Sequence, residues 1–273
     1  MPGVVQSVPA VRAQEAARPI PKVKHPSFPF LRTVRARMLE RYIFNFRIRP
    51  EELKKRLPAP WLEPQVVNGY SAVSFCILWL DRLTVFPIPP VLRFATISCA
   101  YRIGVIDASE PTPVPSVYVT DRWADLPLIA RLGPLILQDT IPVIKAAIGH
   151  DNGGGTHVQM SYTDGAALFS ASVRPAPELG SKVFGSVPEF AQFIKGGVSS
   201  YGPSLVPGKL TKVDLYKEDT SYAPLHADVE FSELNEESWA DAGLEFDSAV
   251  TARGAQYDWA YRGLYSAGPA VPR

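Results

Sequence analysis

Hydrophobic and polar side chains alternate along several long stretches of the chain, and a period of two is typical of β-strands. Between residues 92 and 106, one set of alternate positions is apolar or aromatic, from Ala95 to Val105. The other set has small or polar side chains and one arginine, at Thr96, Ser98, Ala100 and Arg102. Similar patterns predict further strands at residues 66–80, 116–120, 156–162, 166–174, 210–217 and 225–232.

A shorter alternation is followed by the first of two helix signals. Over residues 42–48, aromatic or aliphatic side chains alternate with mainly polar ones, which predicts a half-buried strand. Pro50 then begins a short helix, because its fixed φ angle suits the first helical position. A second helix is predicted over residues 186–197, where Ser186 and Glu189 have the spacing of a capping box.

Many long strands and few helices in one continuous chain predict a mainly β protein of the α+β class. The architecture we expect is a closed antiparallel β-barrel with the helices packed outside it. We expect a single domain over residues 38–265, preceded by a proline-rich flexible arm over 1–37 and followed by a short tail over 266–273. A parallel sheet with crossover helices, or a domain boundary near residue 150, would contradict this prediction.

Composition narrows the class of partner. The chain has 273 residues, of which 20% are charged, and a formal net charge of +1, so charge gives no reason to expect a nucleic acid partner or an anionic membrane. Prolines and charges interrupt the most apolar segment, residues 126–148, so we expect no membrane span. A small-molecule partner is the remaining expectation, and a homo-oligomer stays open.

The two cysteines indicate the compartment. Cys76 and Cys99 lie in apolar predicted strands, which favours two buried free thiols over a disulfide and suits a reducing environment. We therefore expect a cytoplasmic protein. The basic, proline-rich N-terminus leaves an organellar transit peptide as the alternative.

Five segments together resemble the acetoacetate decarboxylase-like superfamily. Residues 40–64 (ERYIFNFRIRPEELKKRLPAPWLEP) and 68–78 (NGYSAVSFCIL) are similar to its opening strand, short helix and second strand. Residues 115–146 fall where that superfamily has its middle strand and inner helical segment. SVPEFAQFIKGGVSSYG and GKLTKVDLYKED (208–219) are similar to its later helix and strand. The resemblance spans roughly residues 38–262 and implies a cone-shaped β-barrel.

In the true decarboxylases of this superfamily, a lysine pair follows a proline, and one of the two lysines forms a Schiff base. Acetoacetate decarboxylase is the standard example of a lysine activated by desolvation or by a second cation. Here Val143 and Ile144 follow the best-matching proline, Pro142. Taking Pro127 instead gives Leu128 and Ile129, so neither alignment supplies a lysine.

The other acid–base positions of the superfamily are also changed in this chain. Its buried glutamate on the second strand corresponds to Cys76, and its arginine falls near Leu39, with Arg37 and Arg41 close by. The resemblance therefore implies a branch of the superfamily that lacks the decarboxylase lysine pair.

Lys145 and Asp139 are the first candidate catalytic residues. Lys145 is the lysine nearest to the matching proline, but Ile144 and Ala146 adjoin it and no second cation does. Its side chain can reach water, so we expect no Schiff base between Lys145 and acetoacetate. Asp139 is either a general base inside the barrel or the cap of a helical turn that follows it.

Tyr118, Asp121, Arg122 and Arg102 complete the set of candidates. An arginine beside a tyrosine can hold a carboxylate, so Tyr118 and Arg122 are candidate substrate-binding residues and Asp121 is a candidate catalytic residue. An Asp121–Arg122 pair at the barrel rim is the alternative. Arg102 lies among small side chains, and the resulting space would suit an anionic ligand if that face lines the interior.

Two other chemistries find little support. His150 and His157 flank glycines, but their spacing with Asp151 fits no standard metal site, so we expect neither a metal nor another cofactor. GVSSYG (197–202) differs from a nucleophile elbow because Tyr201 replaces the second glycine, which argues against a hydrolase.

The sequence therefore predicts a lyase-type enzyme for a small carboxylate or β-dicarbonyl compound, acting inside the barrel without a Schiff-base lysine. Carbon–carbon or dehydration chemistry is expected. A non-catalytic barrel that binds a small hydrophobic ligand and an interaction protein with a filled core are the alternatives. Ionisable groups that converge on the interior would favour the enzyme.

Overall fold

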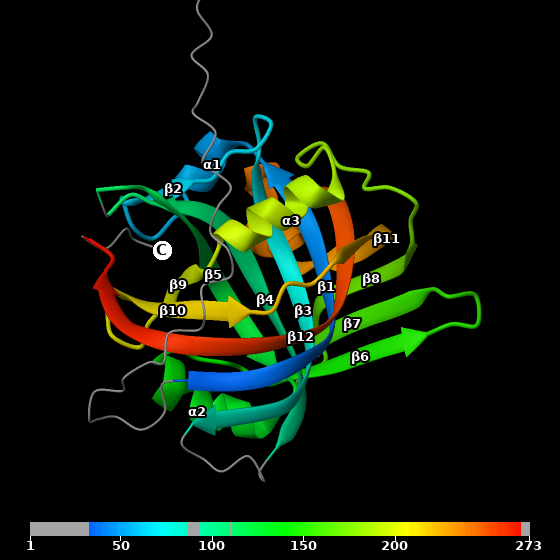
Figure 1. The fold of residues 1–273 in the computed structure, drawn as a ribbon, viewed down its shortest axis with the longest axis horizontal. Helices are drawn as coiled ribbons and strands as arrows, with labels where there is room; N and C mark the ends of the chain where they lie inside the picture. The colour runs from blue at the N-terminus through cyan, green and yellow to red at the C-terminus, as the bar shows by residue number, and fades with distance from the viewer. Residues whose placement is uncertain (1–32, 87–92, 110, 269–273) are drawn as a thin grey trace, which may run out of the picture.

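Seven strands close into a ring in the computed structural model, which describes residues 33–86, 93–109 and 111–268 (Figure 1). Each strand of the ring is hydrogen-bonded to the next, and the last pairs with the first. All of these pairings are antiparallel except that between β5 and β9. In ring order the strands are β1 (Thr33–Ile48), β3 (Ser71–Phe86), β4 (Phe94–Asp107), β5 (Val114–Ala124), β9 (Ser199–Pro203), β10 (Lys209–Lys217) and β12 (Glu245–Ser266).

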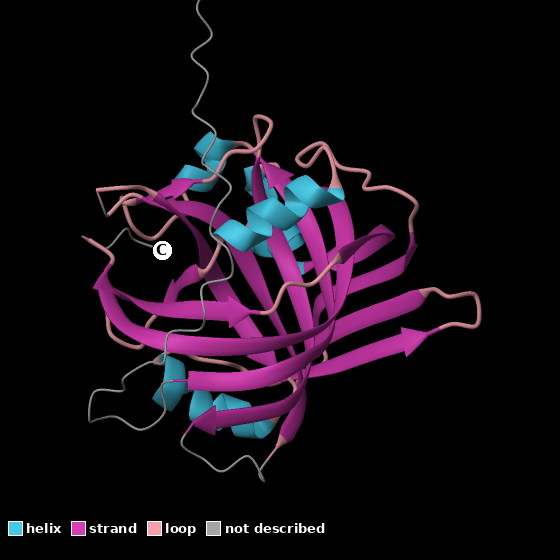
Figure 2. Cartoon of the chain, viewed as in Figure 1, coloured by secondary structure: helices cyan, strands magenta, loops and turns pink. Residues whose placement is uncertain are grey.

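The remaining strands extend the sheet away from the ring. Four of them continue from β12 in the order β11 (Tyr222–Ser232), β8 (Ala167–Pro175), β7 (Thr156–Tyr162) and β6 (Ile144–His150). The short β2 (Leu62–Pro64) pairs with β4. Figure 2 shows how few helices accompany the strands. They are α1 (Pro50–Lys54), α2 (Pro127–Leu137), α3 (Val187–Gly196), the π-helical turn η1 (Leu234–Ser238) and the 3₁₀ turn η2 (Ala240–Ala242).

This architecture confirms the predicted mainly β, largely antiparallel fold. None of the described helices combines the length and the apolar character needed to cross a membrane. The predicted arm lies mostly in residues 1–32, and the end of the predicted tail in 269–273, so both fall outside the described residues. The first strand begins at Thr33, five residues before the domain start that we predicted.

Two hydrophobic clusters lie on the two sides of the ring wall. Alternate residues of β1 enter different clusters: Phe44 joins an outer cluster between the ring and strands β7 and β8, whereas Ile43 joins an inner one. The prediction of a half-buried β1 was therefore wrong. Its polar face is buried inside the ring, where Arg41 is only 3% exposed and Asn45 is 0% exposed.

Helices α2 and α3 pack against the inner cluster at opposite ends of the ring in Figure 1. In α3 the predicted cap is present, since the Ser186 hydroxyl accepts a hydrogen bond from the Glu189 amide, and Phe190 is fully buried. In α2 a proline occupies the first turn, and Gln138, in the left-handed conformation with φ 51°, ends the helix. The two helices limit access to the ring interior.

The predicted strands and helices are all present, but several elements were not predicted. These are β2, β6, β9, η1, η2 and the 22-residue β12, while α2 was expected only through the family resemblance. The helical turn that Asp139 was expected to cap is absent. Residues 139–143 are irregular, and the Asp139 carboxylate accepts a hydrogen bond from the Thr140 amide instead.

Gly104 allows α3 to approach β4 closely. A β-carbon built at Gly104 would lie 2.4 Å from Cζ of Phe193, so any larger residue must displace that ring. We predict that Gly104→Ala lowers the free energy of unfolding by about 1–3 kcal/mol, as expected for overpacking. Urea denaturation measures this change. Gly149→Ala is the matched control, because a β-carbon there meets nothing within 4 Å.

Combining Gly104→Ala with Phe193→Ala provides the second half of this test. If the two side chains collide, the double variant will lose less stability than the sum of the two single variants. Additive losses would show that Gly104 is needed for some other reason.

Candidate functional site

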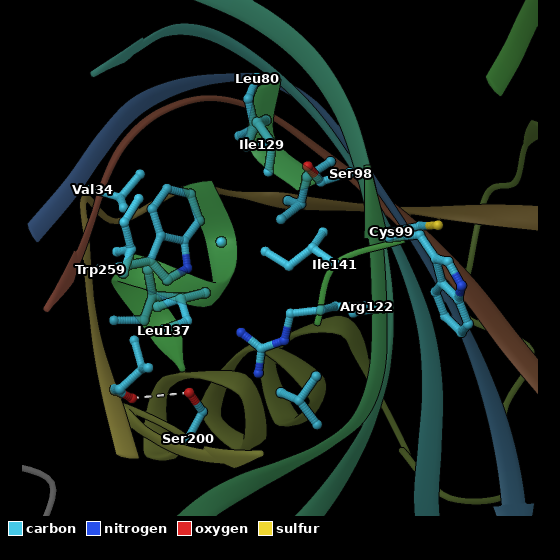
Figure 3. Close-up of a pocket in the computed structure, with 18 of the residues that line it drawn as sticks. Val34, Leu80, Ser98, Cys99, Arg122, Ile129, Leu137, Ile141, Ser200 and Trp259 are labelled. Atoms are coloured by element: carbon cyan, nitrogen blue, oxygen red, sulfur yellow. Dashed lines mark hydrogen bonds between the residues drawn. The ribbon is translucent and has the colours of Figure 1, made fainter. Parts of the chain in front are cut away.

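An apolar cavity of about 180 Å³ lies within the ring beside α2 (Figure 3). Side chains from β3, α2 and β12 form much of its wall, among them Leu80, Leu132 and Trp259. The polar side chains that line it are few: Ser98, Arg102, Arg122 and Ser200. Ser200 donates its hydroxyl hydrogen to the Val213 carbonyl, which leaves the two arginines as the charged groups of this cavity.

A second cavity of about 40 Å³ lies next to the first, on the side of α3. Arg102, Val117, Gly197 and Leu215 line both cavities, so Arg102 stands at their junction. The smaller cavity is much more polar than the larger one. Its other polar lining residues are Arg41, Gln65, Ser74, Cys76, Ser116 and Lys217.

Arg41 is fixed by three partners in the ring interior. Its Nε donates to Sγ of Cys76 at 3.1 Å, and its Nη1 lies 3.4 Å from the Tyr222 hydroxyl and 3.3 Å from the Tyr257 hydroxyl. Burial opposes the charge of Arg41, but interactions with Cys76 and the two tyrosines raise its pKa above the ordinary value. Arg41 is therefore a permanent cation in this cavity.

Arg41 and Arg102 together change the pKa of the Cys76 thiol. Burial alone would raise the pKa of Cys76, but the positive charges of Arg41 and Arg102 outweigh it and lower this pKa below its ordinary value. Tyr222 is affected differently, since burial raises its pKa to about 12 despite Arg41. At neutral pH the tyrosine is therefore a neutral hydrogen-bonding group.

Lys217 is an amine in unusual surroundings. It ends the inward-facing row of β10, after Val213 and Leu215, and its side chain reaches the smaller cavity. Burial and then the positive charges of Arg41 and Arg102 lower the pKa of Lys217 to about 7, although Cys76 opposes this shift. A large fraction of this amine is therefore uncharged, and so nucleophilic, at neutral pH.

Arg102 is the charged side chain at the junction of the two cavities. Its Nε is buried and has no hydrogen-bond partner among the described residues. Burial and the nearby charge of Arg41 lower the pKa of Arg102, with Cys76 opposing, yet a guanidinium remains charged at neutral pH. No aspartate or glutamate of the described chain lines either of the two cavities. An anion would satisfy both the charge and the unpaired donor.

Arg122 and Asp139 form a buried ion pair at the wall of the larger cavity. Nε of Arg122 lies 3.0 Å from Oδ2 of Asp139, and both side chains are largely buried. A β-bulge at Thr120 produces this geometry. Ala100 of β4 lies opposite Arg122 of β5, and Arg102 lies opposite Val119, so β5 has one more residue than β4 over this stretch. Without that extra residue, strand alternation would turn Arg122 to the other face of β5.

The structure brings three of the six sequence-predicted site residues together. Arg102 and Arg122 line the cavity, and Asp139 contacts Arg122. Tyr118 belongs to the outer cluster, and Asp121 is exposed on the outer face of the ring wall, so neither lines these cavities. Lys145 is exposed on β6 and donates to the Thr163 carbonyl at 3.0 Å.

Sequence reasoning missed Lys217 and did not assign a role to Arg41. A usable signal was present for Lys217, since it continues the alternate row of Val213 and Leu215 in a strand that was predicted correctly. Arg41 was noted only as lying near the position of the superfamily arginine. Its burial depends on closure of the ring by β12, which the sequence pattern did not reveal.

Metal-binding groups are sparse in the described part of the chain. No cluster of three or more histidine, cysteine, aspartate or glutamate side chains suits a metal ion there. His150 and His157 instead have hydrogen-bond partners in Thr156 and Ser172.

Comparison with known proteins supports the fold assignment. No protein-family model matches the sequence, and no curated protein matches it either. Among solved structures, acetoacetate decarboxylase from Legionella pneumophila is similar, with a TM-score of 0.61 and 12% identity over 89% of this chain and 94% of that one. An acetoacetate decarboxylase-like enzyme from Sphingomonas wittichii gives a TM-score of 0.58 and 13% identity over 88% and 95% of the two chains.

A third similar structure is the enduracididine biosynthesis enzyme MppR complexed with pyruvate. Its TM-score is 0.58, with 13% identity over 91% of this chain and 95% of that chain. Identities this low establish a shared fold rather than a shared reaction. The chain therefore has the acetoacetate decarboxylase-like fold that its sequence segments resemble.

Proposed function

We propose that the ring interior is the active site of a lyase-type enzyme for a small carboxylate that carries a ketone. The observation that carries this proposal is the Lys217 amine, whose pKa is about 7, in one 40 Å³ cavity with Arg41 and Arg102. The guanidinium groups would bind the carboxylate, and the uncharged amine would react with the ketone.

Besides Lys217, the chemistry requires only solvent water, which supplies and accepts the protons and hydrolyses the final imine. The neutral Nζ of Lys217 adds to the ketone carbon, and loss of water with uptake of one proton from solvent leaves a protonated imine. That imine accepts the electron pair when a bond from the adjacent carbon breaks, either to a carboxylate leaving as carbon dioxide or to a proton. Protonation of the resulting enamine carbon and hydrolysis then release the product and regenerate the amine.

This proposal keeps one sequence-based expectation and replaces another. Lys145 is still expected to form no Schiff base, because it lies exposed on β6. The broader expectation of chemistry without any Schiff-base lysine is replaced, because Lys217 is an amine beside two cations. Lys217 lies on β10, whereas the family pattern would place its lysine pair just before β6.

Similar structures and the ring interior support this proposal over its alternatives. One neighbour is an acetoacetate decarboxylase and another holds pyruvate, a small 2-oxo acid. An interaction protein with a filled core does not account for cavities of about 180 and 40 Å³. A binding protein for a purely hydrophobic ligand does not account for Arg41, Arg102 and Lys217 around one cavity.

Borohydride trapping tests the role of Lys217. We expect incubation with acetoacetate or pyruvate, followed by borohydride, to leave a reduced adduct on Lys217 that peptide mass spectrometry locates. The rate of trapping should rise as pH increases through about 7, because only the uncharged amine reacts.

Two variants control the trapping experiment. Lys145→Met should trap as the unmodified protein does, and Lys217→Met should not trap. An adduct on Lys145, or a rate that stays flat until pH 10, would contradict the proposed site.

A stability measurement tests the lowered pKa without any substrate. In the unfolded chain Lys217 has its ordinary pKa near 10.4, so it binds a proton between pH 7 and 10 that the folded protein does not. Unfolding is therefore coupled to proton uptake in this pH range. The free-energy cost of burying Lys217 is largest below pH 7 and becomes small near pH 10. We predict that Lys217→Met stabilises the protein by on the order of 2 kcal/mol at pH 6 and by much less at pH 10.

Urea denaturation of both proteins at the two pH values measures this effect. Lys145→Met is the matched control, because Lys145 is exposed on β6. Equal stabilisation by Lys217→Met at pH 6 and pH 10 would show that the folded-state pKa is not lowered.

A further inference from the structure

The chemistry proposed at Lys217 places the reacting ketone at the smaller cavity and the carboxylate at Arg102, and it leaves most of the larger cavity without a role. We propose that the 180 Å³ cavity binds the apolar tail of the substrate, so that the ligand is a carboxylate with an unbranched tail of about six carbons. This inference rests on the proposed function, because it takes the head of the same ligand to lie at Arg102.

The lining of the larger cavity matches a hydrocarbon chain. Leu78 and Leu80 of β3 form one wall, Ile129 and Ile136 of α2 form another, and Trp259 of β12 adds an aromatic face. Removing apolar ligand surface from water onto such a wall is favourable, roughly in proportion to the area buried. An apolar cavity that stays empty costs stability in proportion to its volume, so a tail in this space would also recover lost packing contacts.

The volume limits the length of the tail. An apolar protein cavity of roughly 150 Å³ accommodates a benzene molecule. A cavity of about 180 Å³ is slightly larger, so it accommodates a tail of about six carbon atoms. Carbon atoms beyond this length would extend past the apolar lining and gain no further contacts with it.

The position of the charges sets the direction of the ligand. Arg102 lies at the junction of the two cavities, and its Nε has no partner among the described residues. The charge of Arg122, the other charged side chain among the described residues of the larger cavity, is already compensated by Asp139, although its Nε also has no hydrogen bond. The carboxylate therefore belongs near Arg102, with the tail extending into the larger cavity toward its α2 wall.

Calorimetric titration with butanoate, hexanoate, octanoate and dodecanoate tests this arrangement. We expect affinity to rise about threefold to fourfold per methylene group up to octanoate, in line with the transfer of methylene groups from water. Dodecanoate should gain nothing further, because the cavity is then full.

Ser98→Leu is the variant that separates the tail site from the reaction. Ser98 lines the larger cavity only, so a leucine there fills space that the tail would occupy. We expect the preference for octanoate over butanoate to fall at least tenfold, while borohydride trapping of pyruvate on Lys217 persists. The matched control is Ser170→Leu on β8, outside the ring, which should leave the preference unchanged.

Lys217→Met provides the converse separation. Trapping should be lost, while the ratio of octanoate to butanoate affinity should persist because the tail contacts are intact. An affinity that does not depend on chain length, or a preference that Ser98→Leu leaves intact, would overturn the tail site. Failure of trapping in the unmodified protein, with the chain-length preference present, would overturn the proposed reaction and leave the tail site standing.

Discussion

Burial of positive charge inside a closed ring of strands is the constraint on which the site depends. Arg41 is almost completely buried, and it is held by a thiol and two tyrosine hydroxyls rather than by a carboxylate. Its charge is therefore only partly compensated, and it acts on its neighbours. Burial of the Lys217 amine, and then the charges of Arg41 and Arg102, lower its pKa to about 7.

Strand alternation places the charged groups around the smaller cavity. Arg41 on β1, Arg102 on β4 and Lys217 on β10 come from strands far apart in sequence, and each occupies an inward-facing position. On β5, a single-residue bulge moves the inward position from residue 121 to Arg122. The outward positions of the same strands supply the hydrophobic cluster that supports the ring. The outward face of the wall therefore packs in a hydrophobic core, and the inward face carries the charged residues of the cavity.

Much of the fold could be predicted from sequence, because period-two alternation is a local signal. The faces of β4 were predicted residue by residue, and Arg102 was identified from the small side chains around it. The interior of the ring could not be predicted in this way, since a polar face looks the same whether it meets water or a closed cavity. That ambiguity made β1 look half-buried. Lys145 was considered because it lies near the proline that matches the family pattern, and Lys217 was missed. The strand β12, which was not predicted, closes the ring by pairing with β1. The choice of which polar face lies inside the ring therefore depends on long-range strand pairing.

The identity of the group beside Arg41 has consequences for the amine. The family resemblance implies a glutamate at the position of Cys76. A carboxylate there would be ionised throughout the neutral range, and it would pair with Arg41 and raise the pKa of Lys217. A thiol carries less negative charge at the same pH, and it compensates the two arginines less completely. Cys76 therefore allows Lys217 to remain uncharged near neutrality without a second lysine beside it. The groups that lower the pKa of this amine, besides its own burial, are charges on other elements of the fold, first Arg41 and Arg102 and then Lys195 of α3.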